Sequence, residues 1–394
     1  MISEKMRNLV AGNSTIRAMF EEGKRLAAMH GAENVLDFSI GNPSAPPPNA
    51  VKNAILDIIQ GGKDSEIHAY MNNAGYEDMR AVVAGHVNKL QDTKLSSRNI
   101  IMTVGAAGGL NVVLKSIMNP VDEVIMFAPY FPEYVNYISN FDGKSVIVQS
   151  DISTFQPDLD AFEKAVTKNT KAVIINSPNN PTGAVYSEQT IKALAAILEA
   201  KQKEFSSQIY IVSDEPYREI VYNNAFIPYI TKYYSNSLVV YSYSKSLSLP
   251  GARIGYIVAP DELYEFETFI QALTIANRIL GFVNAPGLFQ QVIGKCIDVN
   301  VDMTVYTKNM ELLYDMFERL GFECLKPEGT FYIFPRAINN DAAEFCKKAA
   351  AEHNMLLVPG GAFGCPTHFR LAFCQEFEKI ERAVEKFEAL VKQF

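Results

Sequence analysis

The chain has few of the residues from which disulfide frameworks and metal sites are built. Its 394 residues include five cysteines and five histidines. The cysteines lie far apart and form no CxxC pair, and no two histidines have the spacing HxxxH. This pattern predicts reduced thiols in a cytoplasmic protein and gives no indication of a bound metal.

Long apolar segments and an excess of positive charge are missing as well. No run approaches the roughly 20 apolar residues of a membrane-spanning helix, and the N-terminus lacks the apolar core of a signal peptide. Asp and Glu number 44 against 36 Lys and Arg, so the formal net charge is −8. We therefore expect no membrane span and no general nucleic-acid binding, because nucleic-acid-binding proteins usually carry a basic face.

The sequence does have the composition of an ordinary globular protein, with 48% hydrophobic and 20% charged residues. At roughly 100–200 residues per domain, its length predicts two or three domains. From about residue 50, short apolar runs alternate with helix-like segments. This alternation predicts an α/β domain with a mostly parallel sheet flanked by helices. The runs expected to form its seven strands are 100–104, 123–127, 145–148, 171–176, 209–213, 238–241 and 254–258.

The pattern changes after about residue 284. Residues 285–320 are expected to be helical, and 375–393 have the apolar stripe of an amphipathic helix. Between them, short runs predict a small sheet, with strands at 322–325, 330–334, 355–358 and 369–373.

The N-terminal region has a helical pattern up to about residue 36, followed by a proline-rich connector near residues 43–48. We therefore predict a large domain at 48–285. A smaller α+β domain would combine 1–47 with 286–394.

Small or polar residues follow four of the predicted strands. At TVGAAGG, residues 103–109, a strand gives way to a helix through small residues. Free N–H groups and the positive dipole end of a helix N-terminus suit a phosphate. The alternative is a tight turn that needs small residues, since the spacing matches neither a P-loop nor GxGxxG.

Two further strand ends carry an amide and a carboxylate. Asn180 lies in NSPNNPTG and Asp214 in VSDEPY. Ligands of open α/β sheets usually bind at the carboxyl ends of the strands. There an amide can donate to a ligand oxygen, and a carboxylate can face a cationic ring nitrogen. The alternatives are an ordinary turn rich in Asn, Pro and Gly and a helix N-cap.

The segment SYSKSLSLPGARIGYI places Lys245 after the next strand and Arg253 beyond a Pro-Gly turn. A lysine forms a Schiff base only when it is neutral, which apolar or cationic surroundings favour. The planar fork of an arginine suits a phosphate dianion. Alone, Lys245 is also compatible with a surface position. Together, the four strand ends offer the groups that hold pyridoxal phosphate (PLP).

At this point the chain resembles the class I/II aminotransferases of PLP fold type I, which include aspartate aminotransferase. The segments NSPNNPTGAVY, VSDEPY and SYSKSLSLPGARIGYI carry the resemblance, which extends over about residues 38–373. It implies a fold type I PLP-dependent transferase with a large cofactor-binding domain and a smaller α+β domain.

The resemblance also implies how the cofactor is held. Lys245 forms the internal aldimine and later moves the proton, Asp214 pairs with the pyridine nitrogen, and Tyr217 and Asn180 bind the phenolic oxygen. Phe131 stacks on the ring. The phosphate is bound by Ser242, Arg253, the backbone at Gly105, Ala106 and Ala107, and Tyr70 from a neighbouring subunit.

On the substrate side, the resemblance implies that Arg370 binds the α-carboxylate, together with Asn180 and the backbone of Gly41. Arg278 is a candidate for binding an acidic substrate side chain, although it lies one residue away from the family position. A surface or structural arginine is the alternative interpretation.

The function that the resemblance implies is transfer of an amino group from an L-amino acid to a 2-oxo acid with ping-pong kinetics, by a homodimer. A C–S β-lyase on the same scaffold remains an alternative. A PLP-binding regulator is disfavoured, because about 40 residues before Gly41 leave too little room for a DNA-binding domain. The amino acid and 2-oxo acid themselves are not predicted.

Overall fold

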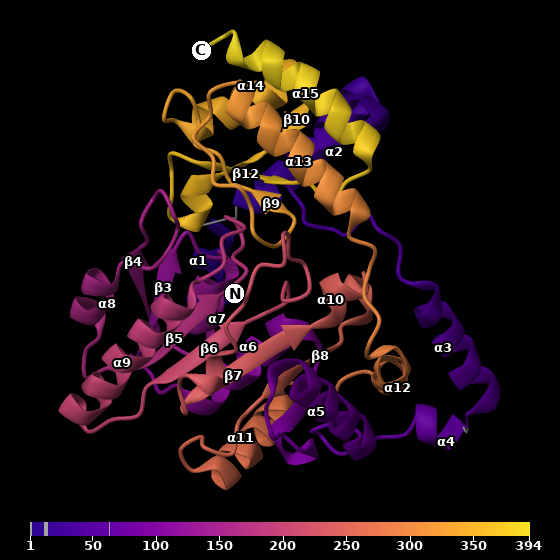
Figure 1. Ribbon diagram of the computed structural model, residues 1–394, viewed down its shortest axis with the longest axis vertical. Coiled ribbons are helices and arrows are strands. Elements are labelled where there is room, and N and C mark those ends of the chain that lie inside the picture. The colour runs from indigo at the N-terminus through magenta and orange to yellow at the C-terminus, as the bar shows by residue number, and fades with distance from the viewer. Residues whose placement is uncertain (1, 12–14, 63) are drawn as a thin grey trace.

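A seven-stranded sheet forms the centre of the larger part of the molecule (Figure 1). The computed structural model describes residues 2–11, 15–62 and 64–394. The strand order is β2-β8-β7-β6-β5-β3-β4, and only β8 runs antiparallel to its neighbours. The predicted mostly parallel sheet is therefore confirmed. The strands are β2 (Ile100–Thr103), β3 (Glu123–Ala128), β4 (Lys144–Gln149), β5 (Thr170–Asn176), β6 (Tyr210–Asp214), β7 (Ser237–Ser242) and β8 (Gly255–Val258).

Helices cover both faces of this sheet, so its inner strands are apolar on both sides. In β3, Val124 and Met126 belong to one hydrophobic core, while Ile125 and Phe127 belong to another. This alternation follows from the two-residue period of a strand. The helices on the first face are α6 (Gly105–Ile117), α7 (Glu133–Asn140) and α11 (Phe266–Ile279); those on the second are α3 (Asn49–Gly61), α5 (Glu77–Gln91), α8 (Leu159–Ala165), α9 (Glu188–Phe205) and α12 (Gly287–Cys296).

The smaller part lies at the top of Figure 1 and contains the C-terminus. Its helices enclose an aromatic core, in which the ring centroids of Phe345 and Phe369 lie 4.8 Å apart. Strand β1 pairs with β10, and a separate sheet has the order β11-β12-β9. The elements are α2 (Thr15–His30), β1 (Leu36–Asp37), α13 (Thr304–Arg319), β9 (Tyr332–Ile333), α14 (Ala342–His353), β10 (Met355–Leu356), β11 (Val358–Pro359), β12 (Phe369–Ala372) and α15 (Phe377–Val391).

The predicted helical region 285–320 is confirmed, and it consists of two helices, α12 and α13, joined by residues 297–303. One sequence prediction in this part was wrong. Residues 322–325 form no strand. Phe322 packs into the aromatic core, and the backbone hydrogen bond from Arg336 N–H to the Glu323 oxygen is not continued by the further bonds of a β-ladder. The amphipathic C-terminal helix is confirmed as α15.

The helix α12 packs with the large part, not the small one. It contacts α3 and α5, and its Val292 and Ile293 belong to the core beneath the large sheet. Val301 is already part of the aromatic core of the small part. We therefore propose that the two domains divide near residues 297–301 rather than at 285.

The N-terminal region also reaches both parts. In α2, Leu26 packs against Leu356 of the small part. The short helix α1 (Glu4–Ala11) instead contacts the large part, where Lys5 pairs with Asp142 at 3.0 Å. Of the predicted N-terminal helical region, residues 1 and 12–14 lie outside the described residues. The small helix α4 (Asp64–Ile67) follows α3 at the edge of the large part (Figure 1).

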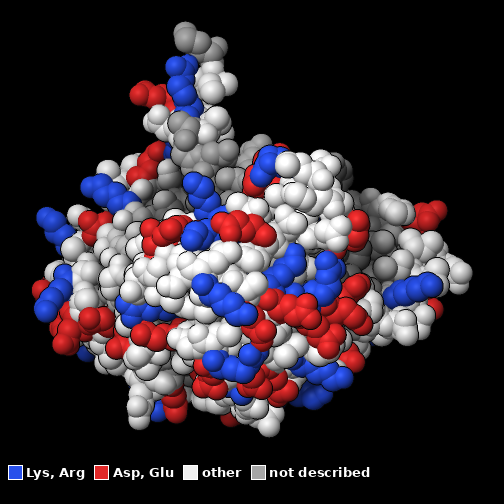
Figure 2. Space-filling model, turned by 90° about the horizontal axis from the view of Figure 1, so that it is seen from above, with Lys and Arg blue, Asp and Glu red and all other residues white. Residues whose placement is uncertain are grey.

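The surface charge, the helix lengths and the cysteines bear on the predictions made from composition. Figure 2 shows basic and acidic side chains interspersed over the face seen from above. Among the described residues, no helix combines the length and apolar character needed to cross a membrane. No cluster of three or more His, Cys, Asp or Glu in the same ranges could hold a metal ion. All five cysteines are free.

Candidate active site

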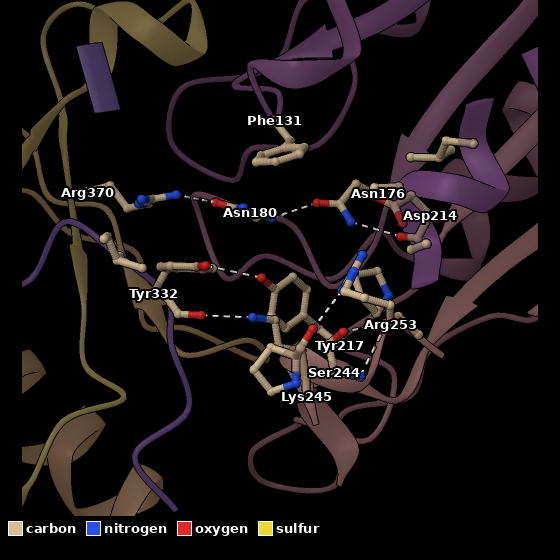
Figure 3. Close-up of a pocket in the computed structure, with 18 of the residues that line it drawn as sticks. Phe131, Asn176, Asn180, Asp214, Tyr217, Ser244, Lys245, Arg253, Tyr332 and Arg370 are labelled. Atoms are coloured by element: carbon tan, nitrogen blue, oxygen red, sulfur yellow. Dashed lines mark hydrogen bonds between the residues drawn. The ribbon is translucent and has the colours of Figure 1, made fainter. Parts of the chain in front are cut away.

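A cavity of about 320 Å³ opens between the carboxyl ends of β5, β6 and β7 and the small part. Figure 3 shows Arg370 at one end and Asp214 with Arg253 at the other. Segments far apart in sequence meet here because parallel strands present their carboxyl ends at one edge of a sheet. The predicted site residues that line the cavity are Gly41, Ala106, Ala107, Phe131, Asn180, Asp214, Tyr217, Ser242, Lys245, Arg253 and Arg370.

Lys245 lies on the short helix α10 (Tyr243–Ser246), directly after β7. Its Nζ donates a hydrogen bond to the backbone oxygen of Gly41 at 2.8 Å. Burial lowers the pKa of Lys245 to about 8; Cys374 opposes this shift, and the positive charge of Arg370 adds to it. At pH 7 a lysine with this pKa is neutral in roughly one molecule in ten, far more often than an ordinary lysine, and a nucleophilic amine must be neutral.

Asp214 ends β6, and its side chain is buried. Its Oδ2 accepts a hydrogen bond from Tyr134 at 2.5 Å, whereas Oδ1 is buried without any partner. Burial raises the pKa of Asp214 to about 7, although the Tyr134 hydroxyl acts in the opposite direction. A buried carboxylate with a free oxygen is costly unless a cation or a donor faces it. The arrangement therefore suits a ligand with a protonated nitrogen.

Arg253 and the start of α6 form the other side of this end of the cavity. Arg253 donates to the backbone oxygens of Pro250 at 2.9 Å and Val104 at 3.2 Å. Gly105 has a φ of +78°, and a Cβ on it would lie 2.7 Å from Nη2 of Arg253. The small residues predicted here are therefore needed so that the arginine can approach the N-terminus of the helix. A guanidinium beside free helix N–H groups suits a phosphate.

Serine hydroxyls complete this end. The Oγ atoms of Ser242 and Ser244 lie 2.7 Å apart, and both residues line the cavity. Ser242 is also the N-cap of α10, where its Oγ accepts from the backbone N–H of Ser244 at 3.2 Å. This cap fixes the helix turn that carries Lys245 relative to the end of β7.

Arg370 lies on β12, and its side chain is buried at the opposite end of the cavity. It donates to Oδ1 of Asn180 at 3.0 Å and to the backbone oxygen of Ser39 at 2.6 Å. Its guanidinium carbon lies 5.0 Å from the ring centroid of Phe363, and its Nε has no partner. A held guanidinium with a free N–H suits a carboxylate.

Two aromatic side chains complete the walls. Phe131, in the loop before α7, projects into the cavity on the side opposite Lys245 (Figure 3). Its ring meets that of Tyr134 edge to face at 5.5 Å. The hydroxyl of Tyr217 lies 3.1 Å from that of Tyr332. A planar ligand would therefore have an aromatic ring on one side and polar groups at its edges.

Three predicted residues do not line the cavity of the chain. Gly105 lies beneath Arg253. Tyr70 follows α4 and is 92% exposed. Arg278 lies in the last turn of α11, also exposed. For Tyr70 and Arg278, a role in catalysis requires a second copy of the chain and stays a prediction.

The sequence analysis also missed four residues of the site. Asn176 and Ser244 stand inside the segments that carried the resemblance, and their positions at strand ends could have identified them. Asn176 donates to the backbone oxygen of Asp214 at 2.8 Å. Tyr134 and Tyr332 had no such signal, because only the fold brings Tyr332 to the cavity and Tyr134 to Asp214.

Comparison with known proteins agrees with this geometry. The family model "Aminotransferase class I and II" matches residues 33–387. A solved aminotransferase structure from Eubacterium rectale is 44% identical and superposes with a TM-score of 0.97, covering 100% of this chain and 99% of that one.

Two curated relatives differ in the substrates that their names give. The aspartate aminotransferase of Thermotoga maritima is 28% identical over 94% of this chain and 95% of its own. The probable N-acetyl-LL-diaminopimelate aminotransferase of Bacillus subtilis is 29% identical over 93% and 91%. The family is common to all of these proteins. The chain therefore belongs to the class I and II aminotransferases and is a PLP-dependent enzyme that transfers amino groups.

Proposed function

We propose that the cavity binds PLP on Lys245 and that an L-amino acid there gives its amino group to a 2-oxo acid by a ping-pong mechanism. The observation that carries this proposal is the buried, unpartnered Oδ1 of Asp214, which lies in the same cavity as a lysine of lowered pKa. Bound PLP supplies an aldehyde carbon for the amino group and a ring that withdraws electrons.

The residues present fit each part of that cofactor. Asp214 Oδ1 would pair with the protonated ring nitrogen, which removes the cost of an isolated buried carboxylate. Arg253, with Ser242 and the N-terminus of α6, would bind the phosphate. The Asn180 carbonyl is already occupied by Arg370, so its amide N–H groups are left to join Tyr217 at the phenolic oxygen.

Lys245 is also the residue that would move the proton. Once a substrate amino group replaces it, its amine is free and, with a pKa of about 8, can both take a proton from Cα and return it. The backbone oxygen of Gly41 lies within hydrogen-bond distance of Nζ and limits where the amine can point.

Arg370 would bind the substrate α-carboxylate. Because Asn180 and Ser39 already hold two of its nitrogens, the guanidinium does not need to be ordered when a substrate arrives. This contact is common to all amino acids and 2-oxo acids. It therefore explains how one site accepts both halves of the reaction.

The substrate side chain is not fixed by these contacts. In the described chain, the basic residues lining the cavity are Lys245, Arg253 and Arg370, and each already has a task. We propose that the enzyme is a homodimer, in which Tyr70 reaches the neighbouring phosphate and Arg278 is a candidate for an acidic substrate side chain. The exposure of both residues supports this. The free cysteines support a cytoplasmic location.

The test is a half-reaction. Cofactor-loaded enzyme is mixed with one amino acid and no 2-oxo acid. A ping-pong aminotransferase releases about one 2-oxo acid per active site and stops, until a second 2-oxo acid restarts it. Lys245→Ala should abolish this release, whereas the exposed Lys168→Ala should not. Sustained release of pyruvate and ammonia would show β-lyase chemistry instead.

A further inference from the structure

Tyr332 is a side chain of the cavity to which the chemistry above gives no task. It lies on β9 of the small part, is 3% exposed and lines the cavity. Figure 3 shows it between Arg370 and the Tyr217–Lys245 side of the site. Its position is therefore between the group that would bind the substrate carboxylate and the groups that would bind the cofactor.

Three contacts join Tyr332 to residues with different tasks. Its hydroxyl oxygen lies 3.1 Å from that of Tyr217. Its ring centroid lies 4.5 Å from the guanidinium carbon of Arg370, where the negative face of a ring attracts a cation. Its hydroxyl also touches the backbone of Gly41, since a Cβ there would lie 1.9 Å from that oxygen. Gly41 in turn accepts the hydrogen bond of Lys245.

The direction of the bond between the two phenols decides where the proton of Tyr217 points. Each hydroxyl has one proton and can accept through its lone pairs. Burial raises the pKa of both, that of Tyr217 well above its ordinary value, so both keep their protons at neutral pH. If Tyr217 donated to Tyr332, it would have no proton left for a ligand oxygen. If Tyr332 donates, Tyr217 is free to donate into the cavity.

We propose that Tyr332 is a positioning residue whose hydroxyl donates a hydrogen bond to Tyr217, so that the Tyr217 hydroxyl donates into the cavity. The ring of Tyr332 meanwhile holds the guanidinium of Arg370. The hydroxyl thus acts on the cofactor side and the ring on the substrate side. The inference rests on the proposed function, because it takes the phenolic oxygen of PLP as the acceptor for Tyr217.

The experiment separates these two actions with Tyr332→Phe, which keeps the ring, and Tyr332→Leu, which removes it. Tyr217→Phe is the reference. For each loaded enzyme, the visible absorbance without substrate is titrated with pH, and KM and kcat are measured for several amino donors. Melting temperature and cofactor content are recorded for each variant.

A donor to the phenolic oxygen stabilises its negative charge, so losing that donor moves the spectral transition to higher pH. We expect a shift of about one pH unit in Tyr217→Phe and about half a unit in Tyr332→Phe. In Tyr332→Phe the KM of the donors should stay within about twofold. Tyr332→Leu should raise KM for every donor by about tenfold, because the ring beneath Arg370 is gone.

The outcomes are distinguishable. If Tyr217→Phe shifts the transition and Tyr332→Phe does not, the inference is overturned while the role of Tyr217 stands. If neither variant shifts it, the role assigned to Tyr217 in the proposed function is contradicted. An unchanged KM in Tyr332→Leu would overturn the part that concerns Arg370. Should that variant not fold, Tyr332→Phe still decides the hydroxyl part through its spectrum.

Discussion

Gly105 offers a test of how the phosphate end of the cavity is built. Its φ is +78°, a region that L-residues avoid, and a Cβ would lie 2.7 Å from Nη2 and 3.1 Å from Cζ of Arg253. Gly105→Ala therefore has two separate effects. The left-handed conformation costs an alanine about 1–2 kcal/mol, and Arg253 must also move away from the start of α6.

The two effects differ in what they change. The backbone strain is present with or without cofactor, so it lowers the melting temperature of the apoprotein by roughly 2–4 °C. The displacement of Arg253 weakens the contact with the phosphate. Hydrogen bonds to charged groups are worth about 1.5–3 kcal/mol, so the dissociation constant of PLP should rise by roughly 10- to 150-fold.

The assay is fluorescence or absorbance titration of apoprotein with PLP, together with thermal melting. The matched control is Gly85→Ala, because Gly85 lies within the helix α5 and a Cβ there meets nothing within 4 Å. This control should raise stability by up to about 1 kcal/mol and leave PLP affinity unchanged. If Gly105→Ala lost stability but kept its PLP affinity, the claim that Gly105 makes room for Arg253 would be refuted.

Three further predictions concern the charged side chains that line the cavity. Arg370→Ala should raise KM for every amino donor by about tenfold or more; an effect on a single donor would contradict its role as a common carboxylate clamp. Asp214→Asn should retain PLP but slow the single-turnover half-reaction by more than about a hundredfold, and a near-normal rate would exclude pairing with the ring nitrogen. The pKa of Lys245 is lowered to about 8, and only the neutral amine attacks an aldehyde. The rate of PLP attachment to apoprotein should therefore rise with pH up to about 8 and then level off, whereas a rate still climbing at pH 10 would show an ordinary lysine.

The sheet could be predicted because each strand carries its own signal. Strands covered on both faces are continuous apolar runs, and all seven runs proposed from the sequence are strands of the large sheet. The small part was less predictable. Residues 322–325 have the composition of a strand, but Phe322 is buried by packing against rings such as Phe317 and Phe345 rather than by pairing with a neighbouring strand.

The residues of the candidate site also differ in how well the sequence predicts them. Asp214 ends β6, Lys245 closely follows β7, and Arg253 lies just before β8, so each is placed by a strand whose segment could be recognised from the sequence. Tyr134 carries no local sign of its bond to Asp214, which lies 80 positions away. Its hydroxyl can be assigned a function only once the fold brings the start of α7 to the carboxyl end of β6.

The position of these groups in the fold explains why the sequence predicts the reaction in more detail than the substrate. The groups that would bind the cofactor stand on the large sheet, where local motifs place them. Those on the substrate side, Arg370 and Tyr332, come from the small part and are held by bonds to Asn180 and Tyr217 across the cavity. The shape of the substrate pocket therefore depends on how the two parts are positioned, and on any second chain that brings Arg278. Breaking the bond between Arg370 and Asn180 while keeping Lys245 and Asp214 should therefore raise KM for every amino donor more than it lowers the rate of proton transfer.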